Sequence, residues 1–94
     1  SVVLKHRETG ELTEMAVGGI FVEIGMLPST DFAKKTVKLD QLGRIITNPK
    51  DQKTSMAGIW AAGDCTDELY HQNNIAAGDA VKALEDIYMH LKAR

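Results

Sequence analysis

The most restrictive feature of this sequence is a short apolar run that ends in a glycine and an aspartate. Residues 58–64 read Gly-Ile-Trp-Ala-Ala-Gly-Asp, which predicts a buried strand with a carboxylate at its end. Ligands of open α/β sheets bind at the carboxyl ends of strands. Gly63 leaves room for a ligand near the backbone, and Asp64 can accept hydrogen bonds from ligand hydroxyls. The alternative is that both residues only form a turn.

A long helix is predicted to follow, from about Gln72 to Lys92. Its apolar residues recur at helical spacing, and they are Ile75, Ala77, Ala80, Val81, Leu84, Ile87, Tyr88 and Leu91. We interpret this stripe as a core-facing surface rather than as a surface for a partner helix. The first turn of such a helix offers free backbone N–H groups and a partial positive charge.

The rest of the chain is predicted to form short elements that alternate with turns. A hairpin is expected from the strands 2–6 and 12–15, and a buried strand from residues 20–24. One or two helical turns should begin near residue 30, with Ser29, Thr30 or Asp31 as the capping residue. These elements and the long helix together predict an α/β fold.

Two further segments connect these elements. Residues 40–43 are predicted to turn and residues 44–47 to continue as a strand, as in a second hairpin. Residues 48–55 are polar and contain a proline, so we expect a surface loop there.

The segment around Asp64 resembles a known signature. Residues 54–64 are similar to the second FAD signature of flavoprotein disulfide reductases, with Thr at the start and Ala, Ala, Gly, Asp at the end. Residues 65–72 resemble the thioredoxin-reductase branch, in which Tyr, a basic residue and Gln precede the long helix, and residues 76–83 resemble its helix interior. Residues 19–30 resemble the strand and Gly-x-x-Pro-x-Thr turn that lead back to the FAD domain. The related alkyl hydroperoxide reductase flavoprotein shares these motifs.

The resemblance implies a fold and a division into domains. It implies the C-terminal portion of an FAD/NAD(P)-binding Rossmann-like fold, with short strands and one long C-terminal helix. Residues 1–18 would be the terminal hairpin of the NADPH-binding domain, and residues 19–25 would be the crossing strand. Residues 26–94 would be the C-terminal part of the FAD-binding domain.

The resemblance also implies a cofactor-binding role for Gly63, Asp64, His71, Gln72 and Asn73. Asp64 would hold the ribityl chain of FAD, and the helix N-terminus at residues 71–73 would face the pyrimidine side of the flavin. His71 stands where the family has Arg or Lys, and we interpret it as a polar flavin contact rather than as a proton carrier. No catalytic residue and no metal ligand set is expected in this segment.

Features that the sequence lacks limit what the segment can do. It contains no Gly-x-Gly-x-x-Gly loop, and its one cysteine, Cys65, is interpreted as a packing residue rather than as a redox thiol. We therefore expect a segment cut from a longer NADPH-dependent reductase that binds FAD and NADPH only as a whole. Its partner would be a thioredoxin-like or peroxiredoxin-type protein disulfide. The alternatives are a stand-alone flavin or protein binder, and a module that only folds or oligomerises.

Charge and size bear on location and association. The net charge is −2, from 11 basic and 13 acidic residues in mixed order, so no nucleic-acid partner is expected. No apolar run is long enough to span a bilayer, and a lone cysteine fits a reducing compartment, so we predict a cytoplasmic protein without a membrane partner. Because 94 residues bury only a small core, we also expect a homo-oligomer.

Overall fold

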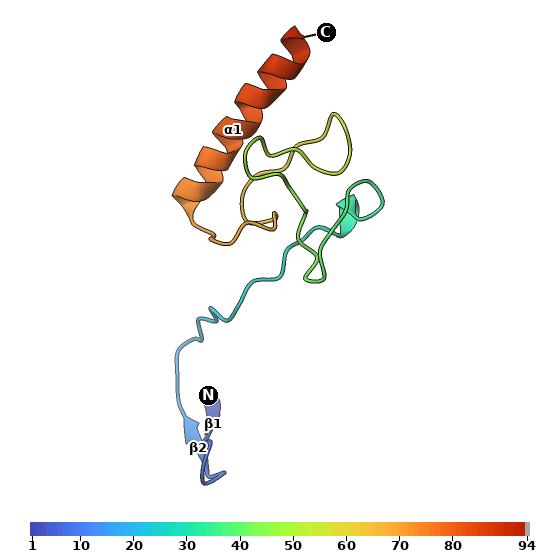
Figure 1. Cartoon of the computed structure of the whole chain (residues 1–94). Coiled ribbons are helices and arrows are strands. Elements are labelled where there is room, and N and C mark those ends of the chain that lie inside the picture. Colours follow the sequence, from blue (N-terminus) through green and yellow to red (C-terminus); the bar gives the residue numbers. More distant parts are fainter. Residues whose placement is uncertain (94) are drawn as a thin grey trace.

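The computed structural model describes residues 1–93 and shows two parts of unequal size (Figure 1). A small hairpin at the N-terminus stands apart from a body that contains the long helix. Residues 16–29 join the two parts as an extended segment. The molecule is therefore elongated, with principal extents of 66 × 26 × 22 Å.

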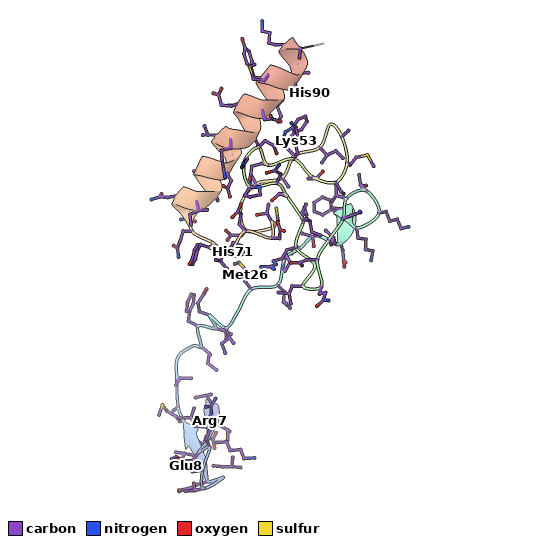
Figure 2. All side chains as sticks on the ribbon, in the orientation of Figure 1. Arg7, Glu8, Met26, Lys53, His71 and His90 are labelled. Carbon is purple, nitrogen blue, oxygen red and sulfur yellow. The ribbon has the colours of Figure 1, made fainter. Side chains whose placement is uncertain are left out.

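The hairpin consists of β1 (Val2–Lys5) and β2 (Leu12–Met15), which pair in antiparallel fashion. The turn is closed by backbone hydrogen bonds from the N–H of His6 to the carbonyl of Glu11 at 2.8 Å, and from the N–H of Gly10 to the carbonyl of His6 at 3.0 Å. Arg7 and Glu8 lie at its tip (Figure 2). The predicted hairpin is confirmed.

The extended segment has no strand at residues 20–24, so the prediction of a strand there was wrong for this chain. Phe21 and Ile24 are 90% and 88% exposed. A strand requires a neighbour for its backbone N–H and C=O groups. Within residues 1–93 no other strand lies beside this segment, since the described sheet contains only β1 and β2.

The body begins with the short 3₁₀ helix η1 (Asp31–Ala33), which confirms the predicted helical turns. Thr30 occupies the N-cap position but makes no capping hydrogen bond with its side chain, contrary to the expected cap. Its hydroxyl donates instead to the carbonyl of Gly43. The buried side chains of Ala33, Val37 and Ile45 form the small core beside η1.

The turn at residues 40–43 is confirmed, and the carboxylate of Asp40 organises it. This carboxylate accepts the backbone N–H groups of Leu42 and Arg44, each at 2.9 Å, and the Nε of Arg44 at 2.7 Å. The backbone N–H and side chain of Arg44, together with the N–H of Leu42, lower the pKa of Asp40 from its ordinary value. Gly43 closes the turn with a φ of +79°.

The two strands predicted in the body are reduced to isolated bridges. Ile45 bridges to Leu39 and to Thr66, and Lys53 bridges to Trp60. Each bridge ends after one residue pair because turns follow on at least one side. The strands predicted at residues 44–47 and 59–62 are therefore wrong as regular elements, although both segments pair where expected.

The loop at residues 48–55 is confirmed, but one of its residues is not on the surface. Gln52 is fully buried and adopts a φ of +62°. Its backbone carbonyl accepts the N–H of Ala61 at 3.1 Å, and its Nε2 donates to the carbonyl of Ala61 at 3.3 Å. Gln52 therefore fixes the loop to the segment that leads into Gly63 and Asp64.

The helix α1 (Asn73–Lys92) confirms the predicted helix to within one residue. The prediction that its apolar stripe faces the core was wrong for most of the stripe, since Leu84 and Leu91 are 63% and 59% exposed. The buried residues of α1 are Asp79 and Ala83. Small and acidic side chains thus contact the body, while the larger apolar side chains lie on the opposite face.

Candidate functional site

Gly63 begins a tight turn at the site singled out by the sequence. Its φ is +87°, a conformation that favours glycine. Its carbonyl accepts the backbone N–H of Thr66 at 3.0 Å and the hydroxyl of Thr66 at 2.7 Å. Because Thr66 is fully buried, the turn is fixed to the body rather than mobile on its surface.

The turn is also held from its other side by the segment that contains Ile45 and Thr47. The N–H of Ile45 donates to the carbonyl of Cys65 at 2.8 Å, and the N–H of Asp67 donates to the carbonyl of Ile45 at 3.0 Å. The carboxylate of Asp67 accepts the N–H of Thr47 at 2.9 Å and its hydroxyl at 3.2 Å. Sequence reasoning missed the role of Asp67, because its partner lies 20 residues away and no local pattern links them.

Asp64 is exposed at the surface of this turn. Within residues 1–93 its carboxylate has no hydrogen-bond or ion-pair partner, in contrast to the carboxylates of Asp40 and Asp67. Cys65, the next residue, packs against the core, as predicted. The turn therefore presents one acceptor group to solvent while its other side chains hold it in place.

The N-terminus of α1 offers the complementary hydrogen-bond donors. Gln72 is the N-cap residue and makes no side-chain capping bond, and the first turn contains no acidic residue. The first bonded N–H of the helix is that of Ala76, which donates to the carbonyl of Gln72 at 2.9 Å. The N–H groups before it have no acceptor within the described chain, so a ligand with negative charge could be bound there.

His71 lies beside this helix end and is partly buried (Figure 2). Its Nε2 is buried and has no hydrogen-bond partner among the described residues. Gln72 and Asn73 are exposed. A buried polar atom without a partner is costly, so His71 is suited to bond with a group that is not part of this segment.

Close packing brings the turn and the helix end together. A Cβ placed on Gly63 would lie 3.4 Å from the Cβ of Ala76, in the first turns of α1. The predicted residues therefore form one neighbourhood, with the acceptor at Asp64 next to the donors of the helix. This combination fits a flavin nucleotide, which has hydroxyl groups on its ribityl chain and carbonyl groups on its pyrimidine ring. No group of three or more His, Cys, Asp or Glu side chains that could hold a metal is found in residues 1–93.

Comparison with known proteins agrees with this geometry. The sequence profile of the pyridine nucleotide-disulphide oxidoreductase family matches residues 2–82. The chain belongs to this family of oxidoreductase enzymes. In the part of the chain that is described, no helix is long and apolar enough to cross a membrane.

Three relatives illustrate the similarity. The chain is 48% identical over 87 residues to an alkyl hydroperoxide reductase of Pseudomonas putida, which covers 93% of this chain and 16% of that protein. It is 43% identical over 77 residues to an NADH dehydrogenase of Bacillus subtilis, which covers 82% and 15% of the two chains. The crystal structure of Lactococcus lactis thioredoxin reductase superposes with a TM-score of 0.85 at 35% identity, over 98% of this chain and 30% of that one. These similarities confirm the α/β fold class and the resemblance to thioredoxin reductases. The chain spans less than a third of the length of each relative.

Proposed function

We propose that this chain forms part of the FAD site of an NADPH-dependent disulfide reductase. In this proposal Asp64 holds the ribityl chain, and the helix end at His71, Gln72 and Asn73 faces the pyrimidine side of the flavin. The single observation that carries it is the close approach of Gly63 to Ala76, because it places a free acceptor beside free donors. The assignment of residues 1–18, 19–25 and 26–94 to three domain segments stays a prediction.

Each group has a defined task in the proposed site. The carboxylate of Asp64 accepts hydrogen bonds from ribityl hydroxyl groups and so fixes the position of the chain that carries the flavin. The N–H groups of the first turn of α1, with the positive end of the helix dipole, stabilise negative charge on the pyrimidine ring. His71 can add a bond through Nε2. Bound FAD itself supplies the transfer of hydride and electrons.

The electron donor and acceptor of the whole protein are part of the proposal. We propose NADPH as the donor and a thioredoxin-like or peroxiredoxin-type disulfide protein as the acceptor. The similarity to a thioredoxin reductase and to an alkyl hydroperoxide reductase supports both acceptors equally. The cytoplasm stays the predicted location.

Titration of the complete flavin-free protein with FAD tests the role of Asp64. We expect Asp64→Ala to weaken FAD binding by about one to two powers of ten, because a hydrogen bond to a charged group contributes about 1.5–3 kcal/mol. Asp31→Ala is the matched control, because Asp31 is an aspartate on η1 whose side chain is 97% exposed. Equal dissociation constants for the two variants would exclude Asp64 from the site.

A further inference from the structure

Three segments of the chain meet at the C-terminal half of α1, in a cluster that we call the Asp86 junction. It consists of Asp51, Lys53, Trp60 and Asp86. The indole Nε1 of Trp60 donates to Oδ2 of Asp86 at 2.8 Å. The ammonium group of Lys53 lies 3.2 Å from the same oxygen and 3.3 Å from Oδ2 of Asp51. One carboxylate oxygen thus joins the helix to two separate parts of the body.

The indole ring of Trp60 is held by a second contact. It packs edge-on against the ring of His90, with centroids 5.4 Å apart and an angle of 69° between the planes. Figure 2 shows His90 near the C-terminal end of α1 and His71 near the opposite end. The Trp60 N–H and the Lys53 ammonium group lower the pKa of Asp86, so Asp86 is ionised at neutral pH. Trp60 is therefore more than the packing residue expected from the sequence.

The position of Trp60 links this cluster to the proposed cofactor site. Trp60 contacts Asp86, and Gly63, a little further along the same segment, contacts Ala76. Asp86 and Ala76 are about 15 Å apart along the helix, from a rise of 1.5 Å per residue. Residues 60–63 therefore touch α1 at two separated points and run opposite to the helix direction. Two such contacts fix how this segment sits along the helix, whereas one would leave it free to pivot.

We propose that Asp86 is a positioning residue for the cofactor site. It fixes Trp60 on α1, and through residues 60–63 it sets the spacing between Asp64 and the donors at the helix N-terminus. A site of this kind depends on supporting residues that hold the contacting groups in place. This inference rests on the proposed function, since it needs FAD to bind between Asp64 and the helix end.

The test uses the complete flavin-free protein, titrated with FAD. Asp86→Ala should raise the FAD dissociation constant about three- to tenfold, in the lower part of the coupling range for residues of one network. Asp86→Asn should restore binding close to wild type, because its amide oxygen can still accept the indole N–H. Glu85→Ala is the control, because Glu85 is the neighbouring exposed carboxylate on the same helix. The NMR resonance of the Trp60 indole N–H, assigned by its loss in Trp60→Phe, should move in Asp86→Ala and not in Glu85→Ala.

The outcomes separate this inference from the proposed function. If Asp64→Ala weakens FAD binding while Asp86→Ala binds FAD like Glu85→Ala, the positioning role is wrong and the proposed function stands. If Asp64→Ala also binds FAD normally, both are wrong. Should Asp86→Ala fail to fold, Trp60→Phe replaces it, since the aromatic ring is kept and the same hydrogen bond is lost. Normal FAD binding by Trp60→Phe would overturn the inference.

Discussion

Replacing Gly63 by alanine tests whether the backbone of the proposed site has the conformation described. The φ of +87° at Gly63 lies in the left-handed region, where an alanine costs about 1–2 kcal/mol. The added Cβ would lie 3.4 Å from the Cβ of Ala76, close to ordinary contact, and adds little. We therefore expect Gly63→Ala to reduce the free energy of unfolding by about 1–2 kcal/mol, which lowers the melting temperature by about 5–15 °C in a chain of this size.

Two other glycines supply matched controls. Gly58 has a φ of +84°, and a Cβ there would meet no atom within 4 Å. Gly58→Ala should therefore cost about as much stability as Gly63→Ala, because the backbone term is the same. Gly18 lies outside the left-handed region and has equally open surroundings, so Gly18→Ala should leave stability nearly unchanged. Any additional loss in Gly63→Ala measures the contact with Ala76.

Urea unfolding and FAD titration together complete the experiment. Of the two left-handed glycines, only Gly63 lies beside Asp64, so Gly63→Ala should also weaken FAD binding by the complete protein, while Gly58→Ala should not. Wild-type stability in Gly63→Ala would refute the backbone conformation. Equal loss of FAD affinity in both variants would refute the link between this conformation and the site.

Three further predictions follow from the described contacts. First, Asp40 and Asp86 have folded-state pKa values below the ordinary 3.8, so their contribution to stability is present above that value and is lost as the pH falls through the lowered pKa values. Replacing both by Asn should flatten the dependence of the urea midpoint on pH between about pH 5 and pH 2, and an unchanged slope would contradict this. Second, the 94-residue chain alone should bind no FAD and show no NADPH-dependent disulfide reduction, and a stoichiometric yellow chromophore in the purified chain would disprove it. Third, the exposed apolar side chains of residues 20–27 should make the isolated chain associate at micromolar concentration. A concentration-independent monomer mass in sedimentation would show otherwise.

The features that the sequence predicted well depend on neighbouring residues. The limits of α1 follow from helical spacing and the turn at residues 40–43 from Asp40 and Gly43, whose hydrogen bonds close within a few residues. The hairpin β1–β2 is local in the same way. A strand at residues 20–24 is a different case, because apolar composition favours it but pairing requires another strand. Its absence from the described chain shows where local preference ends.

The predicted site was found in part for the same reason. Gly63, Asp64 and the helix end could be located because a glycine, an acid and a helix start occur together along the sequence. The contacts that support them could not, since Trp60 and Asp86 are 26 residues apart and Asp67 and Thr47 are 20 apart. The orientation of α1 was also missed. Its larger apolar side chains suggested the buried face, but the body accepts the smaller Ala76 and Ala83.

The two faces of α1 have a practical consequence for protein engineering. Ala83 is buried against the body, so a larger side chain there would force the helix away from its neighbours. Leu84, Tyr88 and Leu91 lie on the other face, where a charged residue would disturb no packing within the described chain. A more soluble version of the isolated segment can therefore be designed by placing Glu and Lys on that one face, which leaves the Asp86 junction and the turn at Gly63 untouched.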